Sequence, residues 1–94
     1  MVENDQKIMS EIIGERHRQV THHGYSQESD LRWKNGELAM AASVYALPPE
    51  KRRMDLWPFD KQFYKPDPNR RTELIKAAAL IIAEIERIEN QGGI

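Results

Sequence analysis

All five prolines of this 94-residue chain fall between residues 48 and 68. Proline lacks an amide hydrogen and clashes with the preceding helical turn, so it interrupts helices, and it is equally excluded from central strands. The stretch from 48 to 68 is therefore predicted to be a connection without a real sheet, apart from a short helical turn at 49–55. The segments on either side of it are free of proline and can form long helices.

Apolar residues recur at helical spacing over residues 4–21 and 30–46, and each segment is predicted to form one helix. Ser29 or Asp30 is the expected N-cap of the second helix, and Pro48 ends it. Gly36 would then lie inside a helix, where it predicts a kink or a close backbone contact. The expected apolar faces are Ile8, Met9, Ile12, Ile13 and Val20 in the first helix, and Leu38, Ala41, Ala42 and Tyr45 in the second.

A third helix is expected from Asp67, as N-cap, and Pro68, as first helical residue, to Asn90. Residues 77–83 read AAALIIA and are apolar on every side, which is more apolar surface than two short partner helices can enclose. We therefore expect a homo-oligomer that forms through this helix. A 4-3-4-3 spacing joins its apolar residues Leu74, Ala78, Ile81, Ile85 and Ile88.

Size and composition narrow the choice of partners. The chain has the length of a single domain, 1–94, which buries little surface on its own, and this again favours an oligomer. Without cysteine it has neither disulfides nor thiolate metal sites, and a net charge of −1 provides no field for nucleic acid. The second helix also has too little charge to recognise DNA. With no apolar run of membrane-spanning length and an acidic N-terminus, we expect a cytosolic protein that binds neither DNA nor membrane.

Residues 57–71, WPFDKQFYKPDPNRR, combine aromatic rings with cationic side chains. Trp57 and Tyr64 are expected to stack on a base, while Lys65, Arg70 and Arg71 are expected to hold phosphate. Arg70 and Arg71 fall in the first turn of the third helix, at the positive end of its dipole. Cations there indicate a nearby anion or carboxylate.

Other interpretations of these residues remain open. The aromatic rings can instead form a lid over the core, with the two arginines paired to carboxylates of Asp60, Asp67 or Glu73.

Arg16 lies in the middle of the first helix's apolar face, so its guanidinium must be paired, face a cavity or extend along the helix to water. The basic run at 51–53 is expected to be a solvated face. The three histidines near the end of the first helix, His17, His22 and His23, are expected on the surface.

Carboxylates offer a second candidate chemistry. All-α nucleotide pyrophosphohydrolases of the MazG type hold magnesium with glutamate pairs on facing helices. Here no pair spaced i, i+3 is matched by a second acidic pair, since Glu86 and Glu89 stand at the end of the third helix. Convergence of Glu15, Glu37 and Glu84 on magnesium would favour such an enzyme. Pairing of each with an arginine would favour binding without turnover.

A set of short motifs runs from residue 15 to residue 87. They are ERxRQ (15–19), GY (24–25), GELAxAAxxYA (36–46), WPFD (57–60), YKP (64–66), RR (70–71) and LxKAxALIxAEIER (74–87). In combination they resemble a family of small phage and prophage proteins. The resemblance implies a phage accessory protein and gives no activity. Members of that family usually have a histidine-aspartate pair before the second helix, where this chain reads Ser29-Asp30-Leu31, so a function of that pair would be impaired here.

The sequence as a whole predicts a mostly α-helical, three-helix domain with an aromatic, proline-rich loop between helices two and three. The predicted function is capture of a small phosphorylated ligand, such as a nucleotide or cyclic nucleotide signal, by a phage accessory protein that acts in counter-defence. The alternatives are a MazG-like magnesium-dependent pyrophosphohydrolase and an inhibitor of a host protein. No catalytic residue, metal or cofactor belongs to the main prediction. The ligand would contact Arg16, Trp57, Tyr64, Lys65, Arg70 and Arg71, with Glu15, Glu37 and Glu84 behind them and Glu37 or Glu84 holding Arg16.

Overall fold

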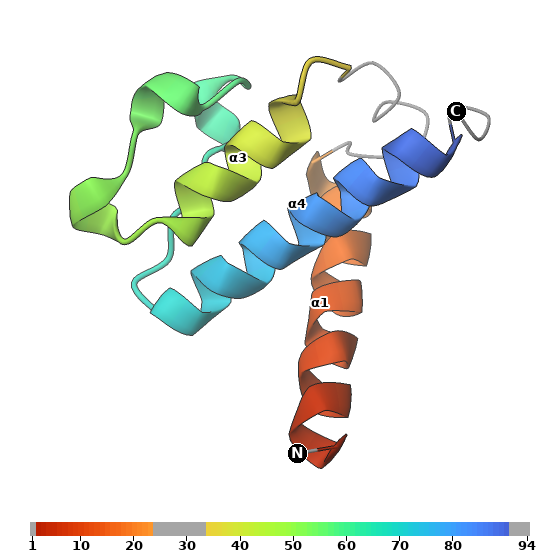
Figure 1. Ribbon diagram of the computed structural model, residues 1–94. Coiled ribbons are helices and arrows are strands. Elements are labelled where there is room, and N and C mark those ends of the chain that lie inside the picture. Colours follow the sequence, from red (N-terminus) through yellow and green to blue (C-terminus); the bar gives the residue numbers. More distant parts are fainter. Residues whose placement is uncertain (1, 24–33, 91–94) are drawn as a thin grey trace.

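The computed structural model describes residues 2–23 and 34–90, and within the first helix it describes the side chains of residues 4–20 (Figure 1). The helices are α1 (Val2–His23), α3 (Glu37–Ala46) and α4 (Arg70–Asn90). Three short 3₁₀ turns, η1 (Pro49–Lys51), η2 (Met54–Leu56) and η3 (Lys61–Phe63), lie between α3 and α4. These described ranges contain no strand. The mostly α-helical class, with an aromatic, proline-rich loop before the last helix, is confirmed.

The helix α4 organises the described fold, because both other helices pack on it. Figure 1 shows α3 side by side with α4 and antiparallel to it, while α1 crosses α4 steeply. The N-terminal half of α1 extends beyond this crossing, and every side chain from Asn4 to Ser10 is exposed. The C-terminal half of α1 therefore makes most of its packing contacts.

The core lies between α3 and α4 and consists largely of small side chains. The predicted inner face of the second helix is confirmed, because all four of its members are buried: Leu38, Ala41, Ala42 and Tyr45. They pack against Ala77, Leu80 and Ala83 of α4. The alanines let the two helix backbones approach closely, and burial of each leucine contributes about 1.5–3 kcal/mol.

The start of α3 differs from the sequence prediction. The helix begins at Glu37, because Gly36 adopts a left-handed conformation with φ of 85°, which a continuing α-helix does not tolerate. Gly36 is therefore the N-cap and not an interior kink. The Glu37 carboxylate accepts the backbone N–H of Asn35 at 2.8 Å and fixes this turn. The expected N-cap at Ser29 or Asp30 lies outside the described residues.

The start of α4 also differs, because Asn69 takes the place of the expected cap. Its side-chain oxygen accepts the N–H groups of the second and third helical residues, at 2.9 and 3.4 Å. Asp67 accepts the N–H of Asn69 at 2.7 Å and so shapes the turn before the cap. The prediction of an Asp67 cap with Pro68 as the first helical residue is therefore wrong by two residues, and α4 begins at Arg70.

The aromatic residues of the loop cover the core. Trp57, Phe59 and Tyr64 pack against its buried residues. The Tyr45 ring stacks on Tyr64 and meets Trp57 edge-on, with the ring centroids 5.6 Å apart in both pairs. Such pairs add about 0.5–1.5 kcal/mol beyond the burial of their surface. The alternative in which these rings form a lid is confirmed.

A buried ion pair fastens the loop to α4. Two guanidinium nitrogens of Arg52 donate to the two carboxylate oxygens of Glu73, at 3.1 and 2.9 Å, and the side chains are only 7% and 2% exposed. Arg52 also donates to the Tyr64 hydroxyl and to the carbonyl oxygen of Leu47, both at 2.8 Å. The expectation that the basic run at 51–53 is a solvated face is wrong for Arg52.

Several donors converge on Glu73. The backbone N–H of Asp67 and the guanidinium of Arg70 also reach its carboxylate, at 3.1 and 3.3 Å. The hydrogen bond from Arg52 is the main reason that the pKa of Glu73 falls to about 2 from an ordinary value of 4.5, while burial opposes the shift. Because the folded pKa lies below the unfolded one, the Glu73 charge stabilises the fold above a pH of about 4.5. This contribution is lost as the pH falls toward about 2.

We expect Glu73→Gln to lower the free energy of unfolding by about 3 kcal/mol at neutral pH, because the Arg52 charge stays buried without its partner. Urea unfolding followed by circular dichroism measures this difference. On acidification from a pH of about 5 to about 2, the wild-type protein should lose stability more steeply than the variant. If the free energy of unfolding depended on pH in the same way in both proteins, this explanation of the role of Glu73 would be wrong.

Candidate functional site

Arg70, which was expected to hold phosphate, holds the end of α3 instead. Its guanidinium donates to the carbonyl oxygen of Tyr45 at 2.7 Å and also to the carbonyl oxygen of Ala46, the last residue of α3. Such terminal carbonyls lack intrahelical partners and carry the negative end of the helix dipole. The antiparallel packing brings them to the first turn of α4. The negative charge expected near Arg70 is therefore supplied within the protein, by the terminal carbonyl groups of α3 and by the Glu73 carboxylate.

Arg71 is also used within the protein. Its guanidinium donates to both carboxylate oxygens of Glu11 in α1, at 2.6 and 2.7 Å. The hydrogen bond from Arg71 lowers the pKa of Glu11, while burial acts against the shift. The pair lies on the surface and links α1 to the start of α4. Neither of the two expected phosphate-binding arginines lines the two pockets described below.

Arg16 is buried, and it has the partner that its position on an apolar face requires. Only 5% of the residue is exposed, and its Nε donates to Glu86 of α4 at 3.2 Å. Glu84, one of the expected partners, accepts the Arg87 guanidinium at 2.7 and 3.0 Å. Glu37, the other one, accepts a backbone N–H in the turn before α3. Glu86 thus takes the place that the sequence analysis gave to Glu37 or Glu84.

The glutamates considered for magnesium do not come together. Glu15 accepts the guanidinium of Arg18 at 2.8 and 2.6 Å and the amide of Gln19 at 3.3 Å. Across the described side chains of residues 4–20 and 34–90, no three carboxylates or histidines cluster as metal ligands would. The side chains of His22 and His23 lie outside these ranges. Glu15 and Glu84 are thus paired with arginines, as expected for binding without turnover, whereas Glu37 accepts a backbone N–H instead.

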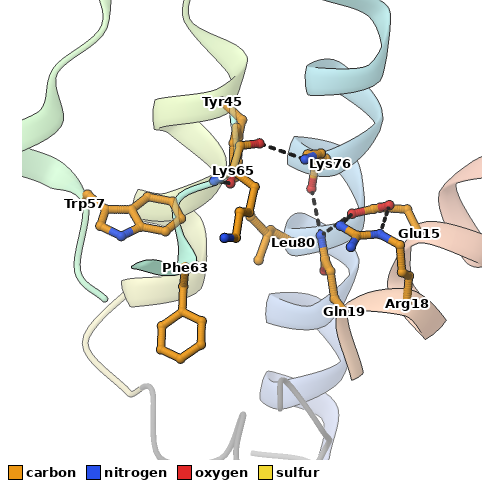
Figure 2. A pocket seen from close by; sticks show the side chains of 9 residues that line it. All are labelled: Glu15, Arg18, Gln19, Tyr45, Trp57, Phe63, Lys65, Lys76 and Leu80. Carbon is orange, nitrogen blue, oxygen red and sulfur yellow. Dashed lines mark hydrogen bonds and ion pairs between the residues drawn. The ribbon is translucent and has the colours of Figure 1, made fainter. Parts of the chain in front are cut away.

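A pocket lies where α1, α4, the end of α3 and the loop meet (Figure 2). The space at the pocket is about 260 Å³ when the open solvent at its mouth is included, and its enclosed part is only about 10 Å³. Figure 2 shows the aromatic rings of the loop on one side and the charged side chains of α1 on the other. The lining residues are Glu15, Arg18, Gln19, Tyr45, Trp57, Phe63, Lys65, Lys76 and Leu80.

Lys65 and Trp57 are the two predicted ligand residues that line this pocket. The backbone of Lys65 is fixed, because its N–H donates to the Tyr45 hydroxyl at 2.8 Å and its carbonyl oxygen accepts from the Lys76 ammonium at 2.7 Å. Burial raises the pKa of Tyr45 to about 12, so this hydroxyl stays neutral. The Lys65 side chain extends between Trp57 and Leu80, and within the described part of the chain its ammonium has no hydrogen bond or ion pair. It is available to a ligand.

The charges of the described residues around the pocket are unbalanced. Among these residues, Arg18, Lys65 and Lys76 contribute three cations, against the single carboxylate of Glu15. Burial, reinforced by repulsion from Arg18, lowers the pKa of Lys76 from its ordinary value of 10.5. The Lys76 ammonium also lies 5.7 Å from the centre of the Tyr45 ring. A partly desolvated excess of positive charge is an environment that an anion would stabilise.

Tyr64, which was expected to stack on a base, is not part of this pocket. Its ring packs on Tyr45 and its hydroxyl accepts from Arg52. It lines a wider depression of about 850 Å³ that is more open to solvent, beside Pro66. The cationic group there, Arg52, already binds the Glu73 carboxylate. This second depression therefore offers no free charge for a phosphate.

Arg18 and Lys76 line the pocket but were not expected from the sequence. For Lys76 a signal was present, since it is the only charged residue in the apolar run LIKAAALIIA at 74–83. A lone cation in a buried helix requires either a partner or a ligand. For Arg18 no such signal was present, because its place depends on how α1 crosses α4.

No family model matches the sequence, and neither the curated proteins nor the solved structures contain a match. The site is therefore interpreted from its own residues. Among the described helices, none combines the length and the apolar character needed to cross a membrane.

The contacts of the two arginines predict different effects of removing them. Arg70→Ala should lower the free energy of unfolding by about 1.5–3 kcal/mol, because charged hydrogen bonds to the end of α3 are lost. Arg71→Ala should change stability little, because its pair with Glu11 is exposed and screened by solvent. Thermal unfolding of both variants tests this, and a larger loss for Arg71→Ala would refute the assignment.

Proposed function

We propose that this protein captures a small phosphorylated ligand, such as a nucleotide or a cyclic nucleotide, in the pocket between α1, α4 and the loop. The observation that carries the proposal is the excess of positive charge beside an aromatic wall, with the Lys65 ammonium unpaired within the described chain. Trp57 and Phe63 provide faces for a base, and Lys65, Lys76 and Arg18 attract phosphate. The ligand residues thus include two of those expected from the sequence and exclude Arg70 and Arg71.

The charge of the described pocket residues suits one phosphoryl group. Among them, three cations and one carboxylate leave a net charge of +2, and a phosphate monoester carries about −1.5 to −2 at neutral pH. The enclosed space is only about 10 Å³, far below the roughly 300–1,000 Å³ of sites that enclose a whole ligand. A nucleotide would therefore place its phosphate at the mouth, beside Lys65, and its base along Trp57.

The side chains of the pocket fit a protein that holds its ligand better than one that hydrolyses it. Hydrolysis of a triphosphate by a MazG-like mechanism needs several carboxylates around magnesium. Among the described residues that line the pocket, the only carboxylate is that of Glu15, and it already accepts from Arg18 and Gln19. Combined with the sequence resemblance, this favours a phage accessory protein that sequesters a nucleotide signal, which is a counter-defence role.

The first test is incubation of the purified protein, with magnesium, in a mixed pool of nucleoside triphosphates and cyclic di- and trinucleotides. Protein and free ligand are separated, the protein fraction is heated, and both fractions are chromatographed. We expect one nucleotide to be depleted from the pool and recovered intact on heating. Conversion to a monophosphate would support the pyrophosphohydrolase instead. An unchanged pool would overturn the proposal and direct the search to host proteins.

Charge reversal within the pocket tests the location of the site. We expect Lys65→Glu to weaken binding at least about tenfold, or about 1.4 kcal/mol, because a repulsive charge replaces an attractive one. Isothermal titration with the ligand recovered from the pool measures the affinity. Lys51→Glu is the matched control, because Lys51 is exposed and lies outside the pocket lining. Equal losses in both variants would mean that net charge, and not this pocket, attracts the ligand.

A further inference from the structure

The helix α4 exposes an apolar stripe on the side that packs against neither α3 nor α1. Its members are those of the 4-3-4-3 spacing, and the four large ones are between 46% and 51% exposed: Leu74, Ile81, Ile85 and Ile88. The core uses other faces of the same helix, through Ala77, Leu80 and Ala83. A spacing that averages 3.5 residues is the one that keeps a seam facing a second helix along its whole length.

A second apolar surface extends along α1. Ile8, Met9 and Ile13 are 39%, 55% and 42% exposed. Met9 and Ile13 lie on the α1 face that carries Arg16, which contacts Glu86 of α4. The apolar face therefore continues along α1 beyond the point where α1 leaves α4, and Figure 1 shows this half of the helix projecting away from the rest.

The combined area is large for a monomer of this size. Seven large side chains at about half exposure, spread over the two surfaces, together present on the order of 600 Å², whereas the largest single patch of a soluble monomer is about 300–600 Å². A standard interface needs about 800 Å² from each partner. The α4 stripe alone falls well short of this value, whereas α4 and α1 together, with the polar atoms around them, approach it.

We propose that a second copy of this chain covers these surfaces, with the two α4 helices packed antiparallel and the projecting halves of α1 completing the interface. The charges of α4 favour the antiparallel orientation. Its first half carries Arg70, Arg71 and Lys76 against Glu73, a net charge of +2. Its second half carries Glu84, Glu86 and Glu89 against Arg87, a net charge of −2. Antiparallel packing brings each basic half to the acidic half of the other copy, and it also opposes the two helix dipoles.

This arrangement has a defined centre. Leu74 and Ile88 each lie seven residues from Ile81, so a two-fold axis near Ile81 brings Leu74 of one copy toward Ile88 of the other. In a two-fold interface, the residue at the axis meets its own copy. A substitution at Ile81 therefore places two altered side chains, one from each copy, against each other at the centre of the interface.

The mass in solution tests the dimer. Light scattering should give the wild-type protein twice the mass of one chain, and Ile81→Glu should reduce the mass to that of a single chain. Met54→Glu is the matched control, because Met54 is similarly exposed at 44% and lies in η2, outside both apolar surfaces. Circular dichroism checks that all three proteins are folded. A wild-type mass of one chain, or an unchanged mass for Ile81→Glu, would overturn the proposal.

Cysteine cross-linking tests the orientation, and the natural chain has no cysteine to interfere. Ile81→Cys should form a disulfide between copies on oxidation, whereas Met54→Cys should not. When Leu74→Cys and Ile88→Cys proteins that differ in tag length are mixed and re-equilibrated, the cross-linked species should contain one of each. Links that join Leu74→Cys to itself would show a parallel pair and overturn the antiparallel arrangement.

Discussion

The pair formed by Arg52 and Glu73 is the interaction on which the rest of the described structure depends. Two opposite charges that are almost fully buried must be satisfied by each other and by nearby hydrogen-bonding groups. Here they bring together three segments: the end of α3 through Leu47, the loop through Tyr64, and α4 through Glu73 itself. If one of these segments separated from the others, a charge would be exposed or left buried without a partner. The loop and the two helices are therefore expected to form together.

This network explains how so long a connection can be compact. Loops longer than about 12–15 residues without secondary structure of their own are uncommon in small domains. The connection over residues 47–69 exceeds that length, and its three 3₁₀ turns are short. Arginine side chains replace the missing backbone pairing, since Arg52 and Arg70 both donate to carbonyl groups at the end of α3. The aromatic rings then fill the space between this polar frame and the core.

The sequence predicted the helices and the buried face of the second one, because proline positions and apolar periodicity are local signals. The starts of α3 and α4 were harder, since they depend on the left-handed turn at Gly36 and on a choice between two good caps, Asp67 and Asn69. The site was predicted only in part. Trp57 and Lys65 line the pocket, but the argument from the helix dipole could not show that the end of α3 would occupy Arg70. Arg52 was expected in solvent, because basic runs are normally solvated, but it is buried against Glu73.

Tyr45 belongs both to the lining of the pocket and to the core. Its ring packs in the core, its hydroxyl fixes Lys65, and its carbonyl oxygen accepts from Arg70. Occupancy of the pocket and folding are therefore thermodynamically linked, and a ligand that binds there must also raise the melting temperature. The same sharing restricts how the site can evolve. For the proposed ligand, substitutions at the rim, at Phe63 and Lys65, would change the preference alone, whereas changes at Tyr45 would alter folding and binding at once.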